Sequence, residues 1–245
     1  MNQNNLNLSR QEFKYFVSSE SLSQLRNSLS ALMLLDRNAN PETRKYTITS
    51  LYFDTPFEED FEEKVDGIKS REKFRVRTYN HDQGLIKFES KRRVETVIKK
   101  VSAQITKGDT RMLCNADYTP FSTADNDFLN ISYAKLKSSG YRPNVIVEYD
   151  REAYYLPYGN IRITFDLNLR TYNTETDLLN LNHSTLPVFQ DDLQVLEVKH
   201  SVPLPSHLKL ILSKINASRS AISKFVLAQR YNQKSAARDK VEIPF

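Results

Sequence analysis

Charged residues at alternate positions mark several short segments of this chain. Near the N-terminus, Arg10, Glu12 and Lys14 are each separated by one uncharged residue. Because successive side chains of a strand point to opposite faces, these three share one face. The same alternation recurs in four further segments, at 73–79, 86–91, 161–166 and 196–199. The pattern predicts a sheet with one charged face and one apolar face.

These charged faces could bind a polyphosphate together with a divalent metal ion. Lys73, Arg75 and Arg77 share one face, and like charges side by side repel unless an anion lies over them. Guanidinium and ammonium groups neutralise phosphate oxygens, and carboxylates bind Mg²⁺ or Mn²⁺. An ordinary half-solvated sheet shows the same alternation, so the pattern alone leaves both interpretations open.

Glycine is too scarce for the common nucleotide-binding loops. The 245 residues include only 5 glycines, and no cluster of them resembles a dinucleotide fingerprint or a P-loop. Any phosphate site must therefore be built from side chains. The net charge of +5 favours an anionic partner.

The remaining composition excludes several classes of protein. The single cysteine, Cys114, excludes a disulfide framework, and the 4 histidines form no H-E-x-x-H zinc motif. The longest apolar run, Ala31–Leu35, is far short of the ~20 residues that span a bilayer. We expect a cytoplasmic protein without a membrane segment of its own, although a membrane partner stays open. No nucleic-acid motif is present, and the oligomeric state is not predicted.

Apolar and polar periodicity predicts more strands than helices. Strands are predicted at 10–17, 47–54, 71–79, 85–92, 94–105, 144–155, 160–169 and 193–199. Helices are predicted at 21–34, 57–65, 124–138, 205–215 and 220–232. This order favours an α+β fold with an antiparallel sheet or barrel. We expect one domain over residues 1–232 and a tail over 233–245.

Eight motifs resemble one known family, in order along the chain. They are RQEFKYFV at 10–17, SLYFDT at 50–55, KFRVRTY at 73–79, KFESKR at 87–92, VEYDREAY at 147–154, IRITFD at 161–166, VLEVKH at 195–200 and SKF at 223–225. Together they resemble the VTC domain, the polyphosphate polymerase domain of the triphosphate tunnel metalloenzyme superfamily. The resemblance extends from about Arg10 to Tyr231.

This resemblance implies a fold and a reaction. The fold is a tunnel of about eight antiparallel strands with a polar, basic lumen and helices packed outside. In the reaction, the γ-phosphoryl group of ATP or another nucleoside triphosphate moves to a growing polyphosphate or pyrophosphate chain. Mn²⁺ or Mg²⁺ would be the cofactor.

The resemblance also implies site residues. Those with implied catalytic roles are Lys14, Arg75, Arg77, Lys91 and Lys224. The predicted phosphate-binding residues are Arg151 and Arg162, by resemblance, with Arg10, Lys73, Lys87 and Lys199 on the same strand faces. Glu197 matches the metal-binding glutamate, and Glu12 and Glu89 are further metal candidates.

Two departures from the family pattern bear on the reaction. Superfamily hydrolases begin with two glutamates and a lysine at alternate positions, whereas Arg10 occupies the first position here. The change favours the polymerase branch. Ala221 stands where the eukaryotic polymerase has a second lysine, which leaves chain binding at that end open. A triphosphate or nucleotide hydrolase and a non-catalytic polyphosphate-binding module remain alternatives.

Some candidate residues have a competing structural role. A salt bridge to Asp166 competes with phosphate binding by Arg162, and Glu12 and Glu89 could instead orient a neighbouring lysine or arginine. Tyr52 is expected to pack in the protein interior. Lys99 and Lys100 are expected to lie on the ordinary surface.

Overall fold

The alternating segments form strands because one face of each packs into a core while the other carries polar side chains. The computed structural model describes residues 11–95, 97–172, 176–180, 184–189, 192–215, 217 and 219–239. The predicted strands are all present, as β1 (Gln11–Ser18), β3 (Tyr46–Asp54), β4 (Arg71–Tyr79), β5 (Asp82–Val94), β6 (Val97–Ile105), β7 (Arg142–Leu156), β8 (Ile161–Thr171) and β10 (Leu193–His200). Two short strands are added, β2 (Leu34–Leu35) and β9 (Leu186–Pro187).

The five predicted helices are also present, with shifted ends. They are α1 (Ser19–Leu32), α2 (Glu59–Val65), α5 (Asp127–Ser138), α6 (Ser206–Ser213) and α7 (Lys224–Asp239). Prediction missed α3 (Lys107–Cys114), α4 (Thr119–Ser122) and the 3₁₀ turn η1 (Tyr158–Asn160). The α+β class is therefore confirmed. Helix α7 continues past Asn232, so the expected boundary between domain and tail falls inside a helix.

Side-chain caps explain where several helices begin. Ser18 accepts a hydrogen bond from the Ser21 amide, which starts α1 before the predicted residue. Thr106 and Asp109 form a capping box at the start of α3. At the end of β3, Asp54 accepts hydrogen bonds from the amides of Asp60 and Phe61, at 2.9 and 3.1 Å, in the first turn of α2. Local hydrogen bonds thus decide ends that hydrophobic periodicity leaves uncertain.

The chain divides into two compact units, each built from three separate stretches. The first unit comprises described residues of 1–46, 150–168 and 189–222, and the second those of 47–149, 169–188 and 223–245. Strands β7 and β8 continue from one unit into the other. Sheet neighbours follow the order β1-β10-β8-β7 in the first unit and β7-β3-β4-β5-β6 in the second. Pairing is antiparallel in both units, as in β1–β10 and β4–β5.

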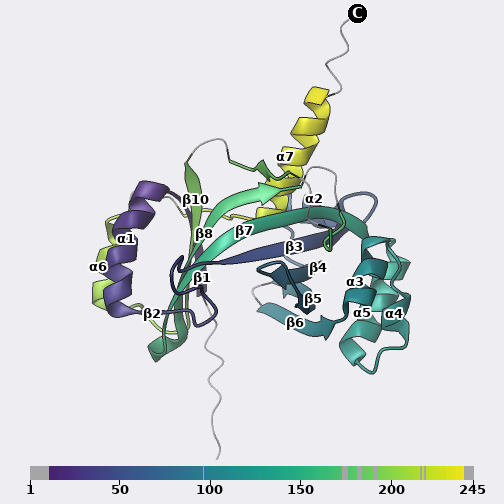
Figure 1. Ribbon diagram of the computed structural model, residues 1–245, viewed down its shortest axis with the longest axis horizontal. Helices are drawn as coiled ribbons and strands as arrows, with labels where there is room; N and C mark the ends of the chain where they lie inside the picture. The colour runs from purple at the N-terminus through teal and green to yellow at the C-terminus, as the bar shows by residue number, and fades with distance from the viewer. Residues whose placement is uncertain are drawn as a thin grey trace, which may run out of the picture. The chain divides into compact units, whose positions relative to one another are not determined.

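In the first unit, helices α1 and α6 cover the apolar face of the strands. Figure 1 shows the two helices side by side against β10 and β8. Leu29 of α1 and Leu208 of α6 share a buried cluster with Phe165 of β8 and Leu196 of β10. The opposite face of these strands carries the charged side chains.

In the second unit, helices α3, α4 and α5 form one group that covers the apolar face of β3–β6 (Figure 1). Phe74, Phe88 and Phe121 pack in this core, with ring centroids 5.8 Å apart for Phe74–Phe88 and 4.8 Å apart for Phe88–Phe121.

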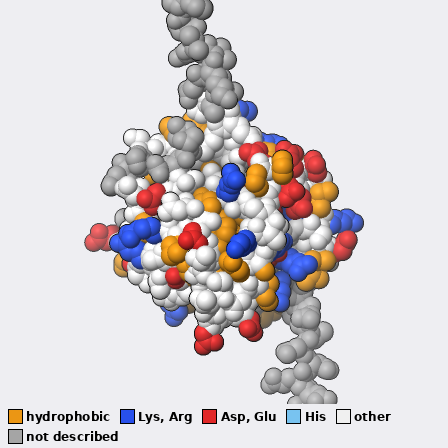
Figure 2. All heavy atoms as spheres, turned by 90° about the vertical axis from the view of Figure 1, so that its right-hand side faces the viewer, with side chains coloured by type: hydrophobic (Ala, Val, Ile, Leu, Met, Phe, Trp, Pro, Cys, Tyr) orange, Lys and Arg blue, Asp and Glu red, His pale blue; other side chains and the backbone are white. Residues whose placement is uncertain are grey.

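On the face of the protein drawn in Figure 2, acidic and basic side chains are interspersed among hydrophobic ones. No helix among the described residues is long and apolar enough to cross a membrane.

Replacing Leu29 with alanine tests the core of the first unit. Leu29 is completely buried, so the cavity should lower the free energy of unfolding by about 2–5 kcal/mol. Leu32→Ala is the matched control on the same helix, because Leu32 is 42 % exposed and should lose about 0.5 kcal/mol or less. Urea unfolding followed by circular dichroism measures both. Equal losses would contradict the placement of α1.

Candidate functional site

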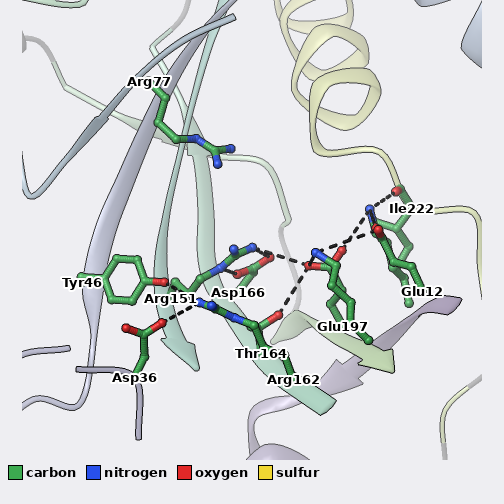
Figure 3. Close-up of polar contacts among 12 residues, drawn as sticks. Glu12, Asp36, Tyr46, Arg77, Arg151, Arg162, Thr164, Asp166, Glu197 and Ile222 are labelled. Carbon is green, nitrogen blue, oxygen red and sulfur yellow. Dashed lines mark hydrogen bonds and ion pairs between the residues drawn. The ribbon is translucent and has the colours of Figure 1, made fainter. Parts of the chain in front are cut away.

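In the first unit, Glu197 lies at the centre of a charged group on the polar strand face (Figure 3). It is 4 % exposed on β10, and its register partners are Lys14 of β1 and Thr164 of β8. Its carboxylate oxygens lie 3.6 Å from Lys14 Nζ, 3.2 Å from Lys199 Nζ and 3.6 Å from an Arg151 nitrogen. Three predicted cations and the predicted metal ligand therefore come together. We call Glu12, Lys14, Arg151, Asp166, Glu197 and Lys199 the Glu197 cluster.

Glu12 supplies a second carboxylate to this cluster. One of its oxygens lies 3.2 Å from Lys14 Nζ, and the other lies 3.9 Å from Lys199 Nζ. Lys14 Nζ also donates to the Ile222 carbonyl oxygen at 3.2 Å. Burial lowers the pKa of Lys199 to about 8, with Glu197 and Glu12 opposing the shift and Arg151 adding to it. Two carboxylates and two ammonium groups thus share one small region.

The arginines of the first unit are paired differently from the sequence-based expectation. Asp166 accepts two hydrogen bonds from Arg151, at 2.6 and 2.8 Å, in a bidentate pair. Arg162 instead donates to Asp36 at 2.6 Å and to the Tyr46 hydroxyl at 3.1 Å. The proposed Arg162–Asp166 bridge is therefore wrong. The charge of Asp166 is already engaged by Arg151, and a loop after α1 brings Asp36 to Arg162.

In the second unit, Glu89 occupies the corresponding central position. It is 2 % exposed on β5, directly across from Arg75 of β4. Its carboxylate lies 2.6 Å from Arg75, 3.7 Å from Arg77 and 2.5 Å from Lys100 Nζ. Arg75 also donates to the Tyr52 hydroxyl at 3.0 Å. We call Tyr52, Arg75, Arg77, Glu89 and Lys100 the Glu89 cluster.

The surrounding cations set the ionisation of two groups in the Glu89 cluster. Burial favours the protonated form of Glu89, but Arg75, Arg77 and Lys100 outweigh burial and lower its pKa to about 2. Burial likewise opposes ionisation of Tyr52, yet the charges of Arg75, Arg77 and Lys224 lower its pKa to about 8. The cluster therefore has an excess of positive charge that stabilises anions.

The start of α7 is anchored on the second unit by Phe225. Its ring lies 5.2 Å from the Tyr52 ring and 6.4 Å from the Phe61 ring, and Lys73 Nζ lies 4.0 Å from its centroid. The preceding residue, Lys224, lies over Tyr149 with Nζ 4.8 Å from the ring centroid. Lys73 thus contacts an aromatic ring that packs on Tyr52 of the Glu89 cluster.

The remaining predicted cations are dispersed. Lys87 Nζ lies 5.9 Å from the Tyr79 ring, and Lys91 is exposed in register with Lys73 and Lys100. Arg10 lies outside the described residues.

Sequence reasoning missed several members of these networks. Lys100 is an ion-pair partner of Glu89 rather than ordinary surface, and Tyr52 hydrogen-bonds Arg75 besides packing on Phe225. Strand alternation could have placed Lys100 on one face with Ser102, but not revealed that Ser102 is the register partner of Glu89 and that Lys100 reaches the Glu89 carboxylate. Asp36 carried no signal, because it lies in a loop whose contact with Arg162 depends on the fold.

Glu12 and Glu197 of the first unit are the candidate ligands for a divalent ion that would complete its shell with other ligands. Among the described residues, no three His, Cys, Asp or Glu side chains converge as a metal site. Glu12 and Glu197 nevertheless lie around the same two ammonium groups. Mg²⁺ is often bound by one or two carboxylates, with water and phosphate oxygens as the other ligands. Glu12 and Glu197 would therefore suffice as the protein ligands of such an ion.

Comparison with protein families decides the assignment. The VTC domain matches residues 9–231, most of the chain. The protein belongs to the VTC domain family. The resemblance seen in the eight sequence motifs is thereby confirmed. No curated protein matches this VTC-domain chain.

Solved structures similar to this VTC-domain protein have low sequence identity. The PH1819 protein from Pyrococcus horikoshii OT3 is 15% identical, with a TM-score of 0.46, and the match covers 89% of this chain and 97% of that one. A Bacillus halodurans protein described as a "putative adenylate cyclase" is 11% identical, with a TM-score of 0.48. That match covers 84% of this chain and 88% of the other. At these values the structures add nothing to the family assignment.

Titration of Tyr52 tests the electrostatics of the Glu89 cluster. We expect one tyrosine to ionise with a pKa of about 8, below the usual value of about 10, because Arg75 and Arg77 stabilise the phenolate. The absorbance of the phenolate, followed against pH in the tryptophan-free chain, measures this step.

Two variants identify the titrating group. Tyr52→Phe should remove the early step, and Arg75→Gln should move it to higher pH because the largest source of stabilising charge is lost. An unchanged early step in Tyr52→Phe would contradict the assignment.

Proposed function

We propose that this protein is a metal-dependent polyphosphate polymerase that transfers the γ-phosphoryl group of ATP to a growing polyphosphate chain. The observation that carries the proposal is the VTC domain match over residues 9–231. It is supported by two clusters in which arginines and lysines surround buried carboxylates on polar strand faces. We also propose that the protein acts in the cytoplasm.

Phosphoryl transfer requires positioning and charge neutralisation more than covalent participation by the protein. In the Glu89 cluster, Arg75 and Arg77 have fixed guanidinium groups because Glu89 and Ser50 hold them. Arginine binds phosphate oxygens through two parallel N–H donors, so prior fixation reduces the entropy lost on binding. We assign Glu89 the role of orienting these arginines, since three cations already neutralise its charge.

In the Glu197 cluster, Lys14 and Arg151 contribute positive charge beside Glu197. Lys14 Nζ would offset negative charge that develops on the transferred phosphoryl group. Lys14 and Lys224 are assigned as electrostatic stabilisers rather than nucleophiles. Arg10, Lys73, Lys87, Lys91, Arg162 and Lys199 complete the proposed set of phosphate-binding residues.

Glu197, with Glu12, would hold the Mg²⁺ or Mn²⁺ ion. The ion supplies charge neutralisation on the phosphate oxygens when it is bound. Each of these two carboxylates lies near both Lys14 and Lys199, so the two lysines hold them in the same region.

The products of the reaction test the proposal. Purified protein incubated with ATP and Mn²⁺ or Mg²⁺ should form polyphosphate chains longer than triphosphate on a gel. Orthophosphate as the sole product would instead indicate the hydrolase. Polyphosphate binding without any ATP turnover would indicate the non-catalytic binding module.

Two substitutions test the roles of the clusters. Arg75→Ala and Glu197→Gln should each lower turnover by about 100-fold or more, the scale seen when one electrostatic stabiliser is removed. Arg111→Ala, which removes an exposed arginine on α3, is the control and should retain activity. Circular dichroism verifies folding. Full activity in either site variant would refute the role assigned to that residue.

A further inference from the structure

The end of the β5–β6 hairpin carries a group of exposed apolar side chains (β5 and β6 in Figure 1). Val94, Val97 and Ile98 are 43 %, 68 % and 49 % exposed. Val94 and Val97 are register partners, so the two strands bring these residues together. Ile98 is the register partner of Arg93, so it lies on the strand face opposite to that of Val94 and Val97. Apolar side chains are therefore exposed on both faces of the hairpin end.

Basic side chains surround this apolar group. Residues 91–100 contain five lysines and arginines and one acidic residue, Glu95. Arg92 and Lys99 are exposed register partners on neighbouring strands. Glu95 forms an ion pair with Lys69, which lies in the loop between α2 and β4; a Glu95 carboxylate oxygen is 3.5 Å from Lys69 Nζ. On one face of the hairpin end, Arg92 and Lys99 therefore follow Val94 and Val97, and on the other face Arg93 lies opposite Ile98.

We propose that the end of the β5–β6 hairpin, residues 92–95 and 97–99, docks on the surface of an anionic lipid bilayer. Apolar side chains enter the boundary between headgroups and acyl chains, while lysines and arginines attract anionic headgroups. A soluble polyanion would use only the cations, so the exposed valines and isoleucine favour a bilayer as the partner. Charged side chains alone suffice to protect a terminal strand from pairing with other chains, so that role does not explain the exposed apolar side chains.

This docking surface adjoins Lys91 and Lys100 but contains none of the residues assigned to phosphoryl transfer. Lys91 and Lys100 are among the proposed site residues, so the variants below leave both unchanged. The polymerase assay uses soluble ATP and no lipid, so either proposal can fail while the other holds.

The absence of tryptophan from the chain allows a direct test. In full-length Val97→Trp, the sole indole should shift its emission to shorter wavelength when vesicles of phosphatidylcholine and phosphatidylserine are added. Vesicles of phosphatidylcholine alone should have no such effect. Ile131→Trp is the matched control, because Ile131 is 71 % exposed on helix α5, outside the hairpin, and its emission should not change.

Vesicle flotation of the unlabelled protein tests the two components separately. Arg92→Gln with Lys99→Gln should weaken binding to anionic vesicles by about tenfold or more, because two attracting charges are lost. Val97→Ser with Ile98→Ser should lose the fraction that stays bound when salt screens the charges. Circular dichroism verifies that each variant folds.

Three outcomes would overturn the proposal. They are an unchanged Val97→Trp emission with anionic vesicles, an equal shift in Ile131→Trp, and a shift that soluble polyphosphate reproduces without lipid. The last outcome would assign the hairpin end to a polyanion.

Discussion

A carboxylate that is almost fully buried remains ionised only if cations surround it, and this requirement organises both charged clusters. Glu89, Asp166 and Glu197 are each exposed by 4 % or less. Arginines and lysines from neighbouring strands therefore point toward them rather than into water. The carboxylates in turn keep like-charged side chains close together, which mutual repulsion would otherwise prevent. The result is two rigid, cation-rich groups on the polar faces of strands.

Each unit combines this polar face with an apolar face under helices, and the two faces depend on one another. A shift of one residue in strand register would exchange them, placing charges in the core and valines and isoleucines among the cations. Packing of residues such as Phe165 and Phe88 therefore fixes the register that aligns Glu197 with Lys14 and Arg75 with Glu89. The core thus positions the site without contributing a polar atom to it. The geometry of the charged clusters and the stability of the fold rest on the same alternation.

Strands and most helices were predictable because their signals are local. Alternation over 71–79 matches β4 in full, and the helical spacing of Leu22, Leu25 and Leu29 marks the buried side of α1. Helix α3 was missed although Thr106 and Asp109 formed a recognisable capping box, because its short apolar pattern was weak. The division into two units could not be predicted, since each unit joins stretches that are far apart in the chain.

By itself the sequence determined which side chains share a strand face, the excess of cations there, and membership of a family recognised by ordered motifs. Only the tertiary structure decided which charges meet. Arg162 pairs with Asp36 rather than with Asp166, which shares its strand face, and Lys100 pairs with Glu89 although its side chain is 47 % exposed. The physical reason is that alternation depends on the geometry of a single strand. Ion pairing depends instead on the register between strands and on the path of loops, both of which packing over the whole chain determines.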